Sequence, residues 1–254
     1  MENDSRQYGQ MDFNLPHDVV SLPSGGLFYN SKKKTVKLGY LTASDENLLA
    51  NINERKTIKE TIVLPLLRSK LYEPDLRPEE LLDGDIEALL IFLRNTSFGP
   101  EYNLILTDPK TDKDFETVIF LDQLDVRKTT AQPDKDGHFV VTLPKTQSVV
   151  KYKLLSLKDS LEVDSILQSY PKNVVAPTAT LKLSKQIVEI DGTDDRVSIE
   201  KFVQNMPIMD SKFLKKFMYD NEPRLDLLRE VLAPSGEKVV VNITFGVEFF
   251  RPFF

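Results

Sequence analysis

Leu22-Pro23-Ser24-Gly25-Gly26-Leu27-Phe28-Tyr29 joins a polar leader to the first part of the chain that has a folded pattern. Glycine has no Cβ, so the Gly25-Gly26 pair permits a sharp turn with positive φ. The Leu-Phe-Tyr run that follows has strand-forming side chains large enough to anchor the turn in a core. Neither G-x-x-x-x-G-K nor G-x-G-x-x-G is present, and a strand pattern follows, which excludes a phosphate-binding loop. We interpret the stretch as a structural turn that opens the first strand.

The segments on either side of this turn differ in composition. Residues 1–21 are polar, with several acidic side chains, and we expect a flexible N-terminal arm. Residues 34–41 alternate as a strand does, and Thr42 or Ser44 can cap the helix that follows. Residues 57–72 have apolar side chains at helical spacing, and Pro65 among them predicts a kink or a restart.

A helix followed by two strands is predicted twice. Asp85 starts a helix with an apolar stripe at Ile86, Leu89, Leu90 and Leu93, and this helix ends at Phe98-Gly99-Pro100. Asp210 can cap a second helix, which ends before Pro223. The strands after the helices are predicted at 102–107, 115–121, 225–232 and 239–245. Both helices share the frame Asp-x-x-x-Leu-x-x-Phe, and we interpret them as two copies of a helix-plus-hairpin unit.

The middle of the chain completes the expected architecture. Strands are predicted at 138–143 and 149–157, a helix at 160–170, one or two strands at 178–190, and a short helix at 198–206. Helices and hairpins do not alternate as βαβ units do, so we predict an α+β fold with small antiparallel sheets. We divide the chain into the arm at 1–21, an N-terminal α+β domain at 22–130 and a C-terminal α+β domain at 131–254.

Composition narrows the classes of function. The chain has 254 residues, 41% hydrophobic and 28% charged, which is typical of a globular protein. It has no cysteine, which excludes disulfides, thiolate nucleophiles and cysteine-ligated zinc. A net charge of −6 argues against nucleic-acid binding. Apolar runs are too short for a membrane span and no secretory signal opens the chain, so we expect a cytoplasmic protein without membrane contact.

No pattern in the sequence predicts a catalytic, cofactor or metal site. His17 lies in the leader and His138 follows a turn, and no G-x-S-x-G elbow is present. The Asp134-x-Asp136-Gly137 stretch lacks the glutamate that a calcium loop needs at its last position. Carboxylates occur in groups that could serve a hydrolase, at Asp83, Asp85 and Glu87, at Asp122 and Asp125, and at Asp194 and Asp195. They fall at predicted helix starts and turns, where capping is the preferred interpretation, and a carboxylate-based hydrolase is the alternative.

Phenylalanine is concentrated at the C-terminus. Five of the 15 phenylalanines lie in the last ten residues, at 245, 249, 250, 253 and 254. They could complete the core as a terminal strand, or they could anchor the chain in a neighbouring subunit, since aromatic side chains dominate interface hot spots.

Three of these segments together resemble the baseplate hub and hub-assembly family of T-even-type contractile-tailed phages. The turn at 22–29 resembles the family's Leu-Pro-Ser-x-Gly-x-Phe-Tyr opening. The helix from Asp85 ends in Arg94-x-x-x-Phe98-Gly99 and resembles the family's central helix. Residues 246–252 resemble its Phe-Phe-x-Pro ending. Relatives carry cysteine pairs at the hairpin turns, and this sequence departs from them there; an ancestral zinc site replaced by packing is a hypothesis.

The resemblance implies a non-enzymatic role in assembling the central hub at the tail tip, as a hub subunit or as an assembly chaperone. The implied partners are other baseplate hub proteins, met in the host cytoplasm or in the virion tail. The residues predicted to contact them are Phe28, Tyr29, Phe249, Phe250, Arg251, Phe253 and Phe254. The oligomeric state stays open.

Overall fold

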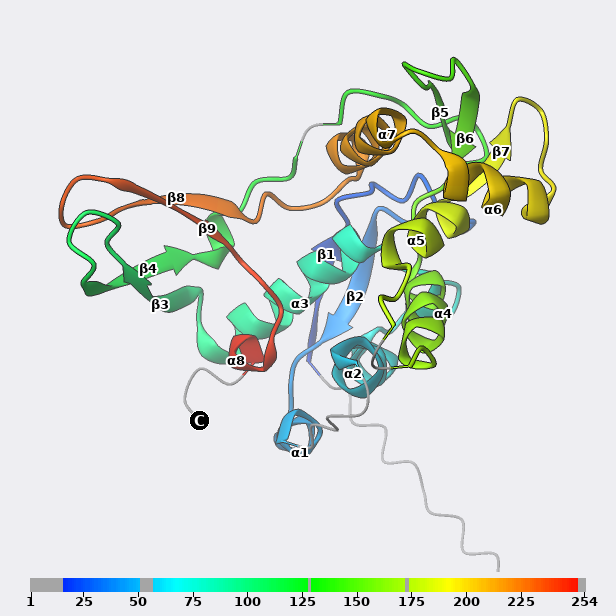
Figure 1. Cartoon of the computed structure of the whole chain (residues 1–254). Helices are drawn as coiled ribbons and strands as arrows, with labels where there is room; N and C mark the ends of the chain where they lie inside the picture. Colours follow the sequence, from blue (N-terminus) through cyan, green and yellow to red (C-terminus); the bar gives the residue numbers. More distant parts are fainter. Residues whose placement is uncertain (1–15, 51–56, 128, 172–173, 251–254) are drawn as a thin grey trace, which may run out of the picture.

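The computed structural model describes residues 16–50, 57–127, 129–171 and 174–250. It confirms the predicted α+β fold, with helices packed around small antiparallel sheets (Figure 1). Three sheets are two-stranded and one has three strands, in the order β5-β6-β7. No helix within the described ranges is long and apolar enough to cross a membrane.

The first half of the chain begins with a hairpin and ends with a hairpin. In chain order its elements are β1 (His17–Ser21), β2 (Thr35–Gly39), α1 (Ala43–Ala50), the π-helical turn η1 (Lys59–Val63), α2 (Leu64–Lys70), η2 (Pro78–Glu80), α3 (Asp83–Phe98), β3 (Glu101–Thr107), β4 (Asp114–Phe120) and η3 (Leu121–Gln123). Pro65 lies in the first turn of α2, directly after η1, so the predicted kink or restart takes the form of a change from π-helical to α-helical winding. The first turn of a helix tolerates proline because its N–H groups have no partner within the helix.

The second half has the same beginning and the same end. Its elements are β5 (Phe139–Thr142), β6 (Val149–Tyr152), α4 (Leu157–Gln168), α5 (Thr178–Gln186), β7 (Ile187–Ile190), α6 (Arg196–Asn205), α7 (Ile208–Asn221), β8 (Leu228–Leu232), β9 (Lys238–Asn242) and α8 (Val247–Phe250). In Figure 1 the hairpins β3–β4 and β8–β9 lie together at one end of the molecule, away from the β5-β6-β7 sheet.

Element order therefore repeats over a longer unit than the predicted helix-plus-hairpin. Each unit runs as a hairpin, two helical segments, a segment that returns to the second strand, a short helix, a long helix and a final hairpin. The returning segment is β7 in the second unit, where Ile187 pairs with Tyr152. In the first unit it is a single bridge between Leu71 and Leu38.

Hydrogen bonds at the first hairpin of each unit also repeat. The Leu22 N–H donates to the Lys34 carbonyl at 2.8 Å, and the Leu143 N–H donates to the Ser148 carbonyl at 2.9 Å. These leucines belong to His17-x-Val-Val-Ser-Leu-Pro23 and His138-x-Val-Val-Thr-Leu-Pro144. This repeated heptapeptide is the sequence signal that reveals the full unit, and the shorter Asp-x-x-x-Leu-x-x-Phe frame did not.

The helix start after each first hairpin repeats as well. The Asp45 carboxylate accepts the Thr42 N–H at 2.6 Å, and the Asp159 carboxylate accepts the Ser156 N–H at 3.2 Å. A lysine near the end of the second helical segment binds each carboxylate, with Lys70 2.5 Å from Asp45 and Lys185 3.7 Å from Asp159. The internal duplication is thus preserved in side-chain contacts and in element order.

The two units share one hydrophobic core. A continuous cluster of buried residues includes Leu38 and Leu89 of the first unit and Tyr152 and Leu214 of the second. Backbone bridges join Leu82 to Ser156 and Val126 to Leu225 across the units. The predicted boundary between 22–130 and 131–254 separates the repeats approximately, but it does not separate two cores.

Three local predictions were wrong. Residues 17–21 form β1 paired with β2, so the predicted arm at 1–21 extends too far; its residues 1–15 lie outside the described ranges. Most of 178–190 is helix α5, which buries Leu183, and only 187–190 remain extended. Asp210 lies inside the first turn of α7 and does not cap that helix.

Candidate functional site

The turn at 22–29 is held from inside the molecule by the first turn of α3. The Asp85 carboxylate accepts the Ser24 N–H at 2.9 Å and the Tyr29 hydroxyl. The Tyr29 oxygen in turn accepts the Leu82 N–H at 3.0 Å. Burial raises the pKa of both Asp85 and Tyr29. Gly25 and Gly26 both have positive φ, and a Cβ on Gly26 would lie 2.3 Å from the Lys33 carbonyl oxygen, which explains the glycine pair.

The second unit holds its Leu-Pro turn in the same way. The Asp210 carboxylate in the first turn of α7 accepts the N–H groups of Lys145 at 2.7 Å and Thr146 at 2.9 Å. These hydrogen bonds outweigh burial and lower the pKa of Asp210. The two aspartates of the repeated frame are therefore structural, and each ties its long helix to its first hairpin.

Phe28 and Tyr29 both contact other parts of the chain. Tyr29 is buried, and Phe28 stacks on Phe139 of the second unit with ring centroids 5.9 Å apart. A Cβ on Gly137 would lie 3.3 Å from the Phe28 ring, so the two units approach closely here. Within the chain the two aromatics join the repeats, and their predicted contact with a partner stays a prediction.

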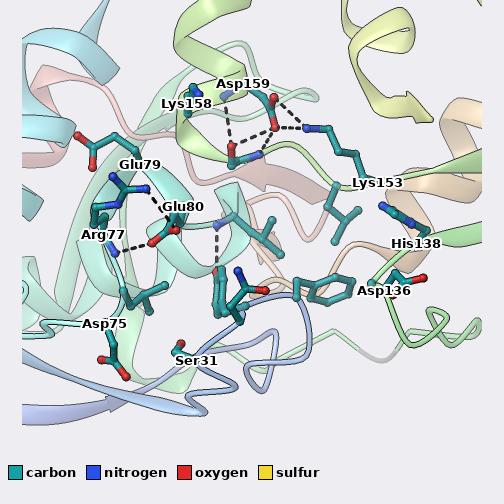
Figure 2. A pocket seen from close by; sticks show the side chains of 18 residues that line it. Ser31, Asp75, Arg77, Glu79, Glu80, Asp136, His138, Lys153, Lys158 and Asp159 are labelled. Atoms are coloured by element: carbon teal, nitrogen blue, oxygen red, sulfur yellow. Dashed lines mark hydrogen bonds and ion pairs between the residues drawn. The ribbon is translucent and has the colours of Figure 1, made fainter. Parts of the chain in front are cut away.

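A pocket of about 300 Å³ lies beside this junction (Figure 2). Its walls come from the turn after β1, the η2 segment, the approach to β5 and the start of α4. Most of its charges are paired, as Lys153 is with Asp159 at 2.8 Å and Asp75 with Lys33 at 2.8 Å. With its charges already neutralised, this pocket indicates no charged ligand.

Two of the C-terminal aromatics, Phe249 and Phe250, belong to the core. Phe249 and Phe250 of α8 are fully buried. Phe249 covers the buried Arg94, whose guanidinium lies 5.7 Å from the ring centroid and donates to the carbonyl oxygens of Gly99 at 2.7 Å and Glu101 at 2.9 Å. Phe249 and Phe250 thus close the core over the end of α3, and their predicted role in partner binding stays a prediction. Arg251, Phe253 and Phe254 lie outside the described residues.

Exposed apolar side chains instead gather on the two terminal hairpins. Strand register places Asn103 opposite Val118 and Glu101 opposite Phe120, so Ile105, Val118 and Phe120 form a diagonal stripe on one face of β3–β4. These three side chains are exposed, Ile105 to 70%. The opposite face, with Tyr102 and Leu104, packs against the core.

The β8–β9 hairpin carries a matching stripe. Register places Glu230 opposite Val240, so Leu228, Val240 and Leu232 form an exposed diagonal on the face away from the core. The tips of the two hairpins are joined, because the Asp108 carboxylate accepts the Ser235 N–H at 3.0 Å and the Ser235 hydroxyl at 2.7 Å. The two hairpins thus form one projection with an apolar stripe on each hairpin. Sequence reasoning placed the hairpins but missed the stripes, which the alternation of side chains along each strand could have revealed.

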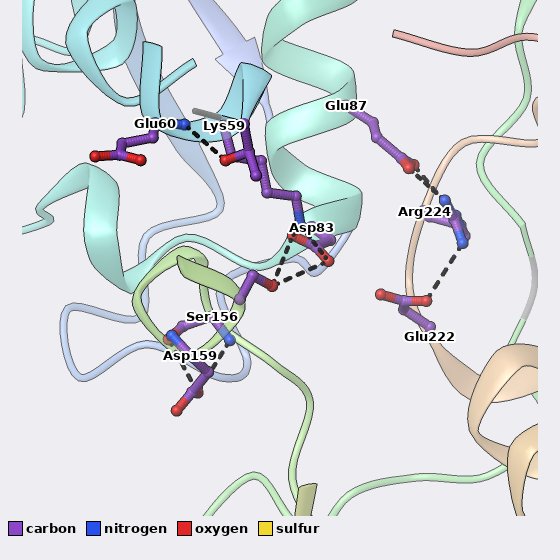
Figure 3. Close-up of polar contacts among 10 residues, drawn as sticks. Lys59, Glu60, Asp83, Glu87, Ser156, Asp159, Glu222 and Arg224 are labelled. Carbon is purple, nitrogen blue, oxygen red and sulfur yellow. Dashed lines mark hydrogen bonds and ion pairs between the residues drawn. The ribbon is translucent and has the colours of Figure 1, made fainter. Parts of the chain in front are cut away.

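A second pocket, of about 440 Å³, lies between the helices of the first unit and the start of the second. One stripe of α3 lines it with Asp83, Ile86, Glu87 and Leu90. Arg224 lies between Glu87 and Glu222 (Figure 3), with its Nε 3.1 Å from Glu87 and its Nη1 3.4 Å from Glu222. Burial raises the pKa of Glu87 to about 7, and it raises the pKa of Glu222 too.

The carboxylates proposed for a hydrolase are not brought together as a group. Asp83 and Glu87 share the second pocket, but Asp85 points to the Ser24 turn. Asp195 caps α6 by accepting the Ser198 N–H at 2.8 Å, and Asp194 is exposed. Among the described residues, no group of three or more acidic or histidine side chains could hold a metal ion.

Comparison with known proteins gives one family. A family model described as T4 bacteriophage base plate protein matches residues 21–243. The match runs from the last residue of β1 through both terminal hairpins. Searches of curated proteins and of solved structures each returned no significant match.

Proposed function

The chain belongs to the T4 bacteriophage base plate protein family, and from this membership we propose that it serves assembly of the central hub of the baseplate. In this proposal it acts without catalysis, through contacts with other baseplate hub proteins. It does so in the host cytoplasm during assembly, as a hub subunit or as an assembly chaperone.

The exposed stripes on the two terminal hairpins carry this proposal. A two-stranded hairpin with an apolar outer face has both edges and that face available for another protein. The Asp108–Ser235 contact joins the tips of the two hairpins, so the two stripes are held in a fixed position relative to each other. Surfaces of this kind fit an assembly protein.

Paired substitutions on each stripe test the contact. The variants are Ile105→Thr with Phe120→Ser on one hairpin, and Leu232→Ser with Val240→Thr on the other. Each should stay folded by circular dichroism and lose at least about tenfold in affinity for co-expressed hub proteins of the same phage. Val175→Ser is the matched control, since Val175 is 95% exposed and lies outside the hairpins. Unchanged affinity in both paired variants contradicts the proposal.

Mass spectrometry of mature particles separates the two forms of the role. Stoichiometric amounts of this chain in the particle support a hub subunit. Its absence from particles that required it for hub formation supports a chaperone.

The proposal that the chain is not an enzyme rests on the roles of the acidic side chains. Asp85 and Asp210 hold turns, and Asp45, Asp159 and Asp195 cap helices. A carboxylate hydrolase would have to use the second pocket. Hydrolysis of a glycoside or peptide library that Glu87→Gln abolishes would replace the non-enzymatic proposal.

A further inference from the structure

The pocket beside α3 has apolar walls and an excess of negative charge. Ile58, Val63, Leu157 and Phe245 line it together with Ile86 and Leu90. Its charged residues are four carboxylates, Asp83, Glu87, Asp164 and Glu222, and two cations, Lys59 and Arg224. Carboxyl groups therefore outnumber cations at the pocket wall by two.

The two cations leave the carboxylates unequally compensated. Lys59 lies 3.2 Å from Asp83, and Arg224 gives two hydrogen bonds to Glu87. Glu222 shares the same guanidinium through one long contact of 3.4 Å, although only 23% of its side chain is exposed. Asp164 has no ion-pair partner within the part of the chain that the structure describes.

We propose that this pocket binds a cationic side chain, arginine or lysine, flanked by an apolar residue in a segment of another protein. The cation would pair with Glu222 and Asp164, and the flanking apolar side chain would lie against Ile86 and Phe245. A partly buried carboxylate that shares its counter-ion is stabilised by a second cation, because desolvation favours charge pairing. The raised pKa of Glu87 and Glu222 has the same cause.

The complementary chemistry makes arginine the better of the two cations. A guanidinium can donate to two carboxylates at once, and its planar face stacks on aromatic rings such as Phe245. This proposal rests on the proposed function only in taking the ligand to be a protein segment. It concerns a site separate from the hairpin stripes.

Titration calorimetry on the full chain tests the site with a defined probe. The probe is the peptide acetyl-Gly-Leu-Arg-Phe-Gly-amide, and the control peptide has citrulline, which is neutral and of nearly the same shape, in place of arginine. We expect the arginine peptide to bind about 10–100-fold more tightly than the citrulline peptide. Equal affinity for the two peptides, or no binding of either, overturns the proposal.

Variants assign the binding to this pocket. Glu222→Gln and Asp164→Asn should each lower the affinity for the arginine peptide by about tenfold and leave the affinity for the citrulline peptide unchanged. Asp164 contacts no other described charge, so its variant keeps the test valid if Glu222→Gln fails to fold. Asp194→Asn, an exposed carboxylate outside the pocket, is the matched control and should bind as the parent does. Binding that both pocket variants leave unchanged overturns the assignment.

The pH dependence supplies a second readout. Asp83, Glu222, Lys59 and Arg224 face Glu87 in the pocket, and a cation arriving there favours the ionised form of Glu87. Binding at pH 7 should therefore release protons, measured by calorimetry in buffers of different ionisation enthalpy. Affinity should rise by about tenfold between pH 6 and pH 8. If the arginine peptide releases no more protons than the citrulline peptide, the proposed site is contradicted.

The same peptides and variants distinguish other possible occupants of the pocket. Self-association that Glu222→Gln abolishes identifies a second copy of this chain as the occupant and overturns the proposal of a separate partner. Peptide binding that occurs only after Arg251→Gln identifies the chain's own terminal cation as the occupant, with the same consequence. Loss of hub binding in the hairpin variants bears on the proposed function alone, since those variants should still bind the peptide.

Discussion

At the residue scale, two aspartates perform one task in two repeats. Asp85 and Asp210 each stand in the first turn of a long helix and accept hydrogen bonds from a Leu-Pro turn about 60 residues earlier. The sequence pattern found both aspartates and the turn at 22–29, because Asp, Gly and Pro have strong local preferences. The partner of each aspartate lies far away in the sequence, and local preferences do not predict that.

The two aspartates should differ in their effect on stability. Asp85→Ala leaves the buried Tyr29 hydroxyl and the Ser24 N–H without an acceptor, and we expect the free energy of unfolding to fall by about 2–4 kcal/mol. Asp210→Ala frees N–H groups of the exposed residues Lys145 and Thr146, which water can bind, so about 1–2 kcal/mol is expected. Urea unfolding measures the loss of unfolding free energy in each variant. A larger loss in Asp210→Ala than in Asp85→Ala contradicts these roles.

Glu87 should make stability depend on pH. Its pKa in the folded chain is about 7, above the ordinary value of about 4.3. A carboxyl whose pKa rises on folding contributes stability that is present below the ordinary pKa and is lost as pH rises through the folded value. The free energy of unfolding should therefore fall between pH 5 and pH 8, and Glu87→Gln should reduce that fall by about 2–3 kcal/mol. Parallel pH profiles for parent and variant contradict the burial of this group.

At the element scale, α3 is positioned by close contact with the linker before β8. A Cβ on Gly84 would lie 2.1 Å from the Pro223 carbonyl oxygen, so the first turn of α3 needs glycine there. In a helix, alanine is more favourable than glycine by about 1 kcal/mol. Periodicity correctly placed this helix, since its apolar stripe is long, but the buried approach of a distant carbonyl leaves no trace in its own sequence.

Gly84→Ala should therefore destabilise the protein despite its better helix propensity. We expect a loss of about 1–3 kcal/mol from overpacking, measured as a lower melting temperature. Ser97→Ala, at an exposed position of the same helix, is the control and should be neutral or slightly stabilising. A stabilised Gly84→Ala variant contradicts the packing of α3 against Pro223.

The positions of the strands were predicted more accurately than the burial of the side chains around them. The hairpins at β3–β4 and β8–β9 followed from alternation and turn residues, with shifted ends at β8 and β9. The C-terminal phenylalanines were ambiguous, because aromatic side chains suit a core and an interface equally well. Phe249 and Phe250 are buried, and Phe249 packs over Arg94, a contact between distant segments that local preferences do not predict.

At the scale of the whole molecule, the two repeats fold around one core. Phe28 of the first unit stacks on Phe139 of the second, and backbone bridges join Leu82 to Ser156 and Val126 to Leu225 across the units. We expect one cooperative unfolding transition. Native-state hydrogen exchange should show the slowest amides of α3 and α7 opening with the same free energy. Separate opening of the two helices would restore the predicted division near residue 130.

We propose that the paired hairpins bring this baseplate protein to the hub. The most direct measurement is complementation of a phage that lacks this chain, scored as the fraction of tails with a complete hub by electron microscopy. The paired stripe variants, Ile105→Thr with Phe120→Ser and Leu232→Ser with Val240→Thr, should produce folded protein and few complete hubs. Val175→Ser should match the parent. Normal hub formation with both paired variants would contradict this role of the hairpins.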